Sequence, residues 1–276
     1  MGIFSWLATE SDDGSAGEKR FADIGAFRDY VMDALRRKPG VSAVTPDSQD
    51  PAMFYAIVEE QTWTLDVTNI YQRLAAYPEE DLDETVERFL TLTDPGEGRQ
   101  LNKKNIVIVI RAQEYVDTLA QKGITVRSES LVGDLAAVFM VDLPDTMSPL
   151  IEGEMAEIAP DELRSIAIAN VTGWLPQVVA DHSQPPSSLY HVEGNTFLST
   201  SLVFIDEFWK LVASKYTGDV LIALPRTDQL FVFDASSPQA SEAARGLVDV
   251  TFEDGFNLLS RQIYQRRNGK LSVFIN

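Results

Sequence analysis

The sequence contains no cysteine and only two histidines, and these absences restrict the chemistry that the chain can perform. Without cysteine there can be no disulfide, no thiolate zinc site, no cysteine-ligated iron–sulfur cluster and no cysteine nucleophile. The two histidines, His182 and His191, flank "SQPPSSLY", and a metal site there would also need ligands such as Asp181 or Glu193. The spacing matches no metal-binding motif, so we expect ordinary histidines in a surface loop and no cofactor.

Sequence motifs of several common enzyme classes are also missing. The chain has no G-x-G-x-x-G and no G-x-x-x-x-G-K-[ST], which disfavours Rossmann and P-loop nucleotide binding. It has no G-x-S-x-G elbow either, although Ser199, Thr200 and Ser201 in "FLSTSLVF" lie near the histidines in sequence. We therefore expect these three hydroxyl residues to lie in an ordinary strand and not in a catalytic triad.

Positive charge is scarce. Lys and Arg number 23 against 42 Asp and Glu, which gives a formal net charge of −19. Such a chain repels phosphate backbones, so we expect no nucleic-acid binding. The exception would be a local basic face that outweighs the net negative charge, such as one formed by Arg261, Arg266, Arg267 and Lys270. The acidic balance favours a protein partner with a basic surface, or an acidic mimic of nucleic acid. The sequence leaves the oligomeric state open.

Long apolar runs are absent from the first residues, "MGIFSWLATESDDGSAGEKR". The apolar run from Ile3 to Leu7 is too short for a signal peptide or a membrane span, and no basic n-region precedes it. Trp6 stands where the myristoylation motif has Ser or Thr. Together with the lack of cysteine, this favours a cytoplasmic protein with no membrane span.

What the chain does have is enough apolar material for a sizeable core: 45% of its 276 residues are hydrophobic. The Pro- and Gly-containing stretch "TDPGEGRQLNKKN" is the best domain boundary. We therefore expect a disordered segment over 1–20, an N-terminal α+β lobe over 21–95, a linker over 96–104 and a C-terminal α+β domain over 105–276.

The hydrophobic pattern predicts helices and strands that do not alternate regularly, which indicates an α+β fold and not a doubly wound one. The first half begins with a helix that has Phe27, Val31, Ala34 and Leu35 on one face and stops at Pro39-Gly40. It continues with three strands over 41–45, 53–60 and 62–67 and helices over 69–77 and 78–92. The second half reads as buried strands over 106–111 and 131–147, a strand over 196–204, and helices over 112–123, 160–175, 205–215 and 237–249. It also has a hairpin over 218–234 and one over 260–275 that turns across Asn268-Gly269. The predicted class is two lobes of mixed, largely antiparallel sheet with packed helices.

The hairpin "GDVLIALPRTDQLFVFD" has two dense apolar arms around a polar knuckle, "PRTD". Strands that are apolar on both faces are covered on both faces, so the knuckle is where we expect the hairpin to reach solvent. Pro225 suits a strand end, and Asp228 suits a turn by bonding nearby backbone. Turn composition explains every residue here except Arg226, which could pair with Asp228 or form a small polar site.

Five segments resemble, in order along residues 21–276, the YtpQ-like family of uncharacterised bacterial proteins, which is defined by a domain of unknown function (1444). They are "LDVTNIYQRL", "LVGDLAAVFMVDLPDTM", "APDELRSIAIANV", "GDVLIALPRTDQLFVFD" and "LSRQIYQRRNGKLSVF". The resemblance implies a soluble bacterial cytoplasmic protein, and it carries no established activity, cofactor or catalytic residue.

These observations favour a non-enzymatic interaction or ligand-binding protein, with Arg226, Asp228 and His191 as the candidate ligand-binding residues. The alternative is a hydrolase or transferase of unidentified type centred on the same three residues. An enzyme predicts that they converge in one concave pocket, whereas a binding module predicts separate positions.

Overall fold

The computed structural model describes residues 21–48, 50–93, 101–121, 123–143, 146–183, 186–216, 218–254 and 257–275. The expected disordered segment, 1–20, and most of the expected linker lie outside the described residues. The chain divides into two compact units, one of residues 1–100 with 144–146 and one of residues 101–143 with 147–276. Helices pack on sheets whose described registers are all antiparallel, so the predicted α+β class is confirmed.

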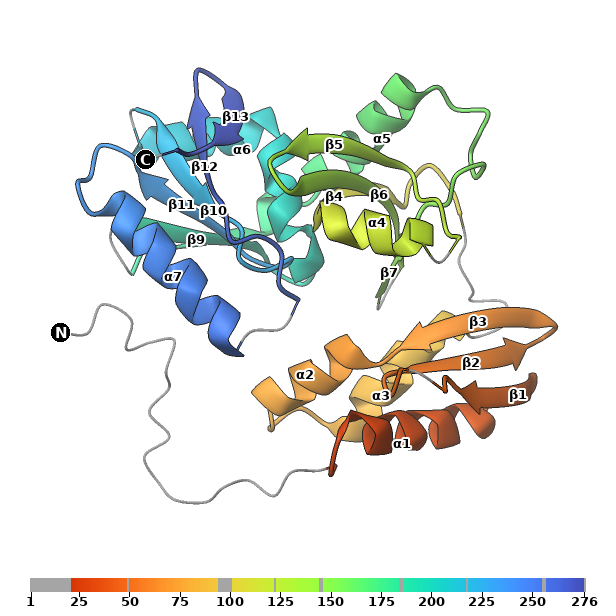
Figure 1. Ribbon diagram of the computed structural model, residues 1–276. Helices are drawn as coiled ribbons and strands as arrows, with labels where there is room; N and C mark the ends of the chain where they lie inside the picture. The colour runs from red at the N-terminus through yellow and green to blue at the C-terminus, as the bar shows by residue number, and fades with distance from the viewer. Residues whose placement is uncertain are drawn as a thin grey trace. The chain divides into compact units, whose positions relative to one another are not determined.

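The N-terminal unit has the predicted order of one helix, three strands and two helices. The strands form a sheet in the order β1-β2-β3 (Figure 1). The elements are α1 (Ile24–Arg36), β1 (Val41–Pro46), β2 (Met53–Val58), β3 (Gln61–Asp66), α2 (Thr68–Ala76), α3 (Leu82–Leu90) and the short 3₁₀ turn η1 (Thr91–Thr93).

Helix α1 shows how the sequence builds this unit. The carboxylate of Asp23 accepts a hydrogen bond from the backbone N–H of Ala26 at 2.8 Å and caps the first turn. Phe27, Val31 and Leu35 recur every four residues, so they share one face, and all three are fully buried. Burial of each such side chain stabilises the unit by about 1.5–3 kcal/mol.

The second unit begins with a small sheet in the order β4-β6-β5, with β7 paired to β6. Its strands are β4 (Ile106–Ala112), β5 (Ser128–Val132), β6 (Leu135–Leu143) and β7 (Thr146–Pro149), and its helices are α4 (Gln113–Gln121) and α5 (Pro160–Thr172). Asn170 fastens α5 to this sheet, because its side-chain amide donates to the carbonyls of Lys103 at 2.8 Å and Ile106 at 2.7 Å.

The prediction of one continuous strand over 131–147 is wrong. The chain turns at Gly133-Asp134, so that β5 and β6 form a hairpin. Gly133 has a φ of +60°, a left-handed conformation that glycine adopts without steric cost. The turn was obscured in the sequence because Leu131 and Val132 at the end of β5 and the aliphatic residues of β6 lie directly on either side of it.

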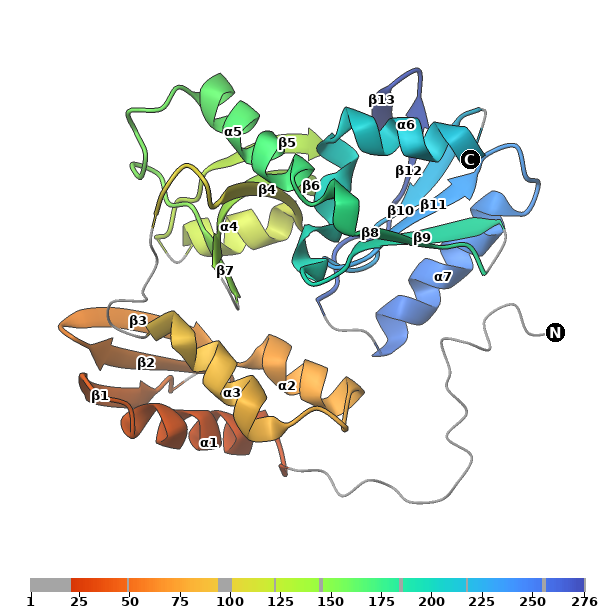
Figure 2. The ribbon, with the colours of Figure 1, turned by 180° about the vertical axis from the view of Figure 1, so that it is seen from behind.

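The larger sheet of the second unit has the order β13-β12-β10-β11-β9-β8. Helix α7 (Ala240–Asp254) covers one face (Figure 1), and helix α6 (Asp206–Lys215) lies with η3 (Thr196–Phe204) on the other (Figure 2). The strands are β8 (Val178–Asp181), β9 (Ser187–Val192), β10 (Val220–Ala223), β11 (Leu230–Asp234), β12 (Ile263–Arg267) and β13 (Lys270–Val273), and a short 3₁₀ turn, η2 (Leu175–Gln177), precedes β8. Side chains on both faces of β10 and β11 are buried, as the apolar arms of the hairpin predict.

Two further predictions for this unit had different outcomes. The hairpin across Asn268-Gly269 is confirmed, and both residues have the positive φ that a tight two-residue turn requires. The strand predicted over 196–204 is instead the 3₁₀ helix η3. There the Ser199 hydroxyl donates to the carbonyl of Thr196 at 2.7 Å, a local bond by which serine competes with strand pairing.

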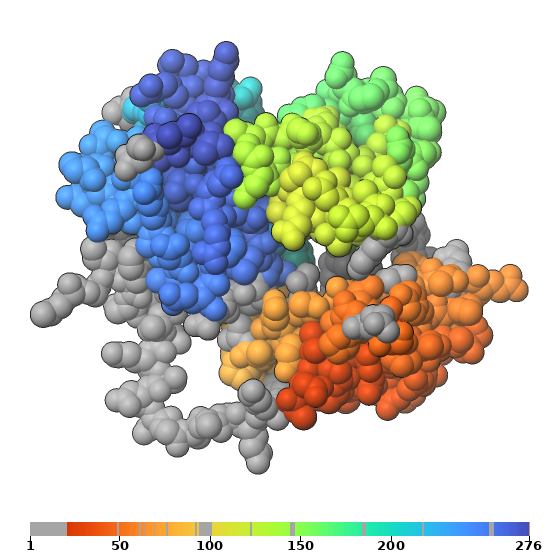
Figure 3. Space-filling model, in the orientation of Figure 1, coloured from red at the N-terminus to blue at the C-terminus, as the bar shows by residue number. Residues whose placement is uncertain are grey.

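A partly buried carboxylate joins the two sheets of the second unit. Asp134, in the β5–β6 turn, accepts hydrogen bonds from the hydroxyl of Ser260, at 2.8 and 3.0 Å, and from the hydroxyl of Tyr264 on β12. We call these three residues the Asp134 clamp. Figure 3 shows the surface of the β5–β6 hairpin meeting that of the C-terminal hairpin, and β5 contacts β13 there.

No helix in the described part of the chain combines the length and the apolar character needed to cross a bilayer.

We predict that Gly133→Ala destabilises the protein more than Gly123→Ala does. Both glycines have positive φ, at +60° and +78°, so alanine at either position costs about 1–2 kcal/mol in backbone strain. Only at position 133 would the new Cβ clash with Oε1 of Gln262 and lie 2.9 Å from Cγ2 of Val273, which adds about 1–3 kcal/mol of overpacking. Urea denaturation of both variants measures the difference. Equal losses would mean that the β5–β6 turn does not pack tightly against β12 and β13.

Candidate functional site

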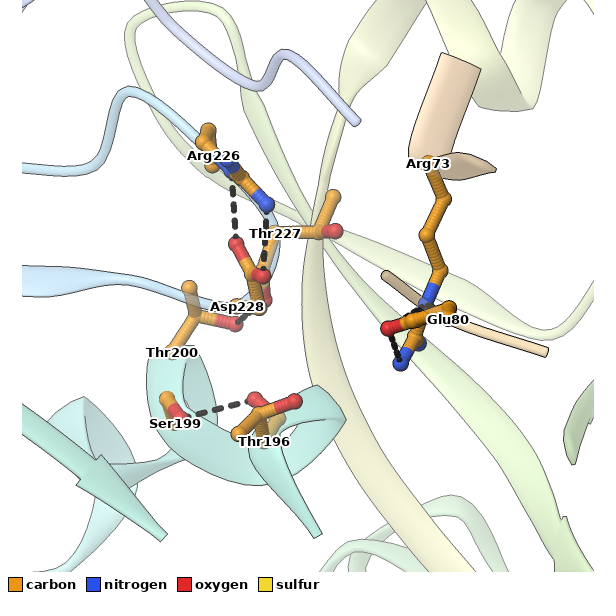
Figure 4. Close-up of polar contacts among 8 residues, drawn as sticks. All are labelled: Arg73, Glu80, Thr196, Ser199, Thr200, Arg226, Thr227 and Asp228. Carbon is orange, nitrogen blue, oxygen red and sulfur yellow. Dashed lines mark hydrogen bonds and ion pairs between the residues drawn. The ribbon is translucent and has the colours of Figure 1, made fainter. Parts of the chain in front are cut away.

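Arg226 and Asp228 pair through two parallel hydrogen bonds. Nε of Arg226 donates to Oδ1 of Asp228 at 3.0 Å, and Nη2 donates to Oδ2 at 2.9 Å (Figure 4). This is the bidentate arrangement in which the planar guanidinium fork matches a carboxylate. The expectation that the two side chains point the same way and lie close enough to pair is confirmed.

The knuckle reaches solvent only in part, because Thr227, Asp228 and Gln229 are partly exposed whereas Arg226 is buried. The side chains of Arg226 and Asp228 are only 10% and 21% exposed. The preceding residues, Leu224 and Pro225, are buried, and segment 257–260 covers them by backbone pairing, with Thr227 N–H donating to the carbonyl of Asn257 at 2.9 Å. The tight turn from Arg226 to Gln229 is therefore partly covered, and its long-range pairing with 257–260 is what the local sequence could not reveal.

The role expected for Asp228 also differs. A turn aspartate commonly accepts from nearby backbone N–H groups, but the described contacts of this carboxylate are with the Arg226 guanidinium. Removing that guanidinium would leave a largely buried carboxylate without its two hydrogen bonds. The pair is thus a part of the turn's own structure.

A second arginine lies beside this pair. Arg111, at the end of β4, interacts electrostatically with Asp228 and with Tyr115 of α4. Burial lowers the pKa of Arg111, while Tyr115 and Asp228 act in the opposite direction. Thr200 of η3 also contacts the turn, because its hydroxyl donates a hydrogen bond to the carbonyl of Thr227 at 3.3 Å (Figure 4). Sequence analysis missed Arg111, which reads only as the polar end of "IVIVIR".

His191 is not joined to this cluster by any contact of the described residues. It lies on β9 opposite Val179 of β8, and its electrostatic interaction is with Asp181. Arg226 and Asp228 therefore pair with each other. His191 follows Tyr190, which pairs with Leu230 of β11, so its backbone lies near the knuckle, but no described contact joins its side chain to the pair.

The other histidine does contact a serine, although not one of those considered in the sequence. Nδ1 of His182 lies 2.7 Å from the hydroxyl of Ser188, which also lies 2.6 Å from the hydroxyl of Tyr216. Ser188 is fully buried, so its hydroxyl is not presented to a substrate as a nucleophile must be. Burial, followed by the charge of Lys215, lowers the pKa of His182.

The hydroxyl residues of "FLSTSLVF" are engaged inside η3. Ser199 bonds Thr196, and Thr200 bonds Thr227, as Figure 4 shows, and both are fully buried. Ser201 is also fully buried, and its hydroxyl has no hydrogen-bond partner among the described residues. None of the three contacts a histidine in the described part of the chain, which leaves the triad geometry without support.

Each unit has a hollow on its described surface. The hollow in the N-terminal unit, about 430 Å³, lies between α1 and α3 and is lined by Tyr30, Ala34, Arg37, Asp83, Glu84, Val86 and Glu87. The hollow in the second unit, about 290 Å³, lies between α7 and the β12–β13 hairpin. Neither is lined by Arg226, Asp228 or His191. Among the described residues, no three His, Asp or Glu side chains gather as metal ligands would.

The N-terminal unit holds a bidentate pair of its own. Arg73 of α2 donates to both carboxylate oxygens of Glu80 at 2.7–3.0 Å (Figure 4). The hydrogen bonds from Arg73 are the main reason why the pKa of Glu80 lies below its usual value. Glu80 precedes α3, so the pair ties α2 to the connection between the two helices.

In the Asp134 clamp a partly buried carboxylate accepts hydrogen bonds from two buried hydroxyls. Tyr264 is fully buried and Ser260 nearly so, and their hydroxyls lie 2.7 Å apart. Burial first, and then the hydrogen bond to Asp134, raise the pKa of Tyr264 far above its usual value, so it stays a neutral donor. The residues are 126 and 130 positions from Asp134, and no local pattern signals the cluster.

We predict that Arg226→Ala lowers the free energy of unfolding by about 3 kcal/mol, because it leaves the carboxylate of Asp228 buried without its hydrogen bonds. The double variant Arg226→Met with Asp228→Leu should regain most of this loss, since apolar residues of similar volume avoid burying an unpaired charge. Chemical denaturation measures each change.

Arg267→Ala is the matched control. It also removes an arginine from an ion pair, with Asp219, but the side chain of Arg267 is 66% exposed, so the expected cost is only about 0–1 kcal/mol. Ile222→Ala, which empties a fully buried position on β10, should cost about 2–5 kcal/mol and shows the effect of damage to the hairpin itself. A loss for Arg226→Ala no larger than that for Arg267→Ala would contradict the structural role of the pair.

Comparison with known sequences relates the chain to bacterial proteins whose names assign no activity. A "UPF0354 protein" from Listeria monocytogenes serotype 4a is 22% identical over 219 residues, which is 76% of this chain and 82% of that protein. Two further UPF0354 proteins, from serovar 1/2a and serotype 4b of the same species, are each 23% identical and cover 76% and 63% of this chain and 82% and 66% of their own length. No family model matches the chain, and no solved structure shows significant similarity to it. The similarity supports the expected relationship with uncharacterised bacterial proteins.

Proposed function

We propose that this chain is a non-enzymatic, soluble binding protein that works in the cytoplasm, needs no cofactor and recognises a protein partner with a basic surface. We further propose that it belongs to the YtpQ-like family. The similarity to UPF0354 proteins and the five segments named above support this membership.

The observation that carries the proposal is that the described contacts do not join the side chains of Arg226, Asp228 and His191 in one site. Arg226 and Asp228 bind each other in a partly buried turn, and His191 has its electrostatic interaction with Asp181. The alternative, a hydrolase or transferase centred on Arg226, Asp228 and His191, requires the three to converge around a substrate. The described hollows are lined by other residues, which favours binding over catalysis.

Charge supports the class of partner. The net charge of −19 attracts basic surfaces at long range and repels nucleic acids. The lining of the hollow between α1 and α3 also has an excess of negative charge. It contains three carboxylates, those of Asp83, Glu84 and Glu87, and one guanidinium, that of Arg37. Electrostatic complementarity of this kind accelerates encounter and selects partners more than it raises affinity.

Affinity capture from a lysate of the native host tests the proposal. We predict that the tagged protein retains a basic protein at about 0.05 M salt and releases it at about 0.5 M, because added salt shortens the Debye length and screens exposed charges. Mass spectrometry identifies what is retained. A capture set without basic proteins, or one that high salt does not change, would contradict the proposed partner class.

The same assay tests Arg226, Asp228 and His191, which we keep as candidate ligand-binding residues. Arg226→Lys retains the charge but gives up the planar fork, Asp228→Asn removes the carboxylate charge, and His191→Ala removes the imidazole. A partner lost by a variant with an unshifted thermal melt assigns that residue to binding. An unchanged partner set for all three removes them from the site.

A further inference from the structure

The hollow of about 290 Å³ in the second unit gathers positive charge in a strongly acidic chain. It lies between the C-terminal half of α7 and the β12–β13 hairpin, outside the Arg226–Asp228 cluster. Arg245, Val248 and Asp249 line it from α7, where positions three and four residues apart share one helix face. Arg261, Gln262 and Phe274 line it from the other side. We call it the α7 hollow.

Its two arginines are available to a ligand. Arg245 is exposed and has no ion-pair partner among the described residues. The side chain of Arg261 is 62% exposed, and its Nη1 lies 3.9 Å from Oδ1 of Asp249, which is beyond hydrogen-bonding distance. Each guanidinium therefore has N–H donors that a ligand can use.

An aromatic ring holds one of these guanidiniums in place. The guanidinium carbon of Arg261 lies 4.2 Å from the centre of the Phe252 ring, one turn further along the same face of α7. A stacked guanidinium keeps its in-plane N–H donors pointing outward, so the stacking fixes the plane of the fork without consuming its hydrogen bonds. The fork is thus partly ordered before a ligand arrives, which reduces the entropy lost on binding.

The rest of the lining is apolar, apart from one amide. Val248, Val273 and Phe274 offer aliphatic and aromatic surface. The side-chain oxygen of Gln262 is buried and has no hydrogen-bond partner in the described part of the chain. The backbone N–H of Gln262 donates to the Ser260 hydroxyl at 3.0 Å, so the Asp134 clamp fixes this end of the hollow.

We propose that the α7 hollow binds a small organic carboxylate with an apolar body, a role that goes beyond the proposed recognition of a protein partner. The guanidiniums of Arg245 and Arg261 bind the carboxylate, and the apolar lining takes the hydrocarbon part. The volume lies at the lower end of the range for ligand sites, about 300–1,000 Å³, which limits the ligand to a small molecule. The carboxylate of Asp249 repels the bound anion and therefore lowers the affinity of the hollow for it.

Isothermal titration calorimetry of the full chain with hexanoate, hexan-1-ol and inorganic phosphate, at equal ionic strength, tests the proposal. We expect saturable binding of hexanoate in the millimolar range or tighter, and no saturable binding of hexan-1-ol, which lacks the charge. Phosphate should bind more weakly than hexanoate because it gains nothing from the apolar lining. Equal binding of hexanoate and hexan-1-ol, binding of phosphate as tight as that of hexanoate, or no binding of hexanoate would each overturn the proposal.

Three variants and one control place the site. Arg245→Ala and Arg261→Ala should each weaken hexanoate binding about tenfold, which is typical for the loss of a charge-assisted hydrogen bond. Asp249→Asn should strengthen it, because the opposing carboxylate is gone. Arg267→Ala removes an exposed arginine of β12 that pairs with Asp219 outside the hollow, and should leave binding unchanged.

Arg245 is exposed and without a described partner, so its alanine variant should melt like the parent protein and give a clear reading. Unchanged hexanoate binding by the folded Arg245→Ala variant, or weaker binding by Asp249→Asn, would contradict the assignment. Loss of a protein partner in the capture assay with hexanoate binding intact would separate the two roles.

Discussion

The structure of the second unit depends on one partly buried carboxylate. Asp134 stands in the turn between β5 and β6, and it accepts hydrogen bonds from Ser260, which precedes β12, and from Tyr264 on β12. A carboxylate removed from water is costly unless donors replace its hydration, and two hydroxyls do so here. Because Ser260 also pairs by backbone with Leu224, at 3.1 Å, the clamp holds segment 257–260 over the knuckle. It thereby encloses the Arg226–Asp228 turn and fixes Gln262 at the edge of the α7 hollow.

This arrangement shows how the most conspicuous polar residues of the second unit are engaged. Within the second unit, strongly polar side chains satisfy one another: Arg226 with Asp228, His182 with Ser188, and Asp134 with the clamp hydroxyls. Such pairs favour one packing arrangement over others. Any other arrangement would leave one polar group of a pair buried without a hydrogen-bond partner, which is energetically unfavourable. What remains open to other molecules is the acidic surface of the chain and a small hollow in which arginines gather, and our two proposals rest on these features.

The sequence predicted elements well where a local physical signal was strong. The spacing of Phe27, Val31 and Leu35 identified α1, and Asn268-Gly269 identified the last hairpin, because each pattern acts within a few residues. The pairing of Arg226 with Asp228 was predictable for the same reason. The burial of that pair was not, since it depends on residues 257–260, and the clamp was not, since its members lie 126 and 130 positions apart. The 3₁₀ helix η3 was mistaken for a strand because its apolar residues suit either structure.

A double-mutant cycle on the clamp tests the account most directly. Asp134→Ala, Tyr264→Phe and the double variant are denatured in urea, and the coupling free energy is taken from the three changes. If the hydrogen bond between these side chains joins the two sheets, the coupling should be at least about 1 kcal/mol, as for a hydrogen bond to a charged group. Additivity within about 0.3–0.5 kcal/mol would show that the two residues act independently, and it would contradict the account.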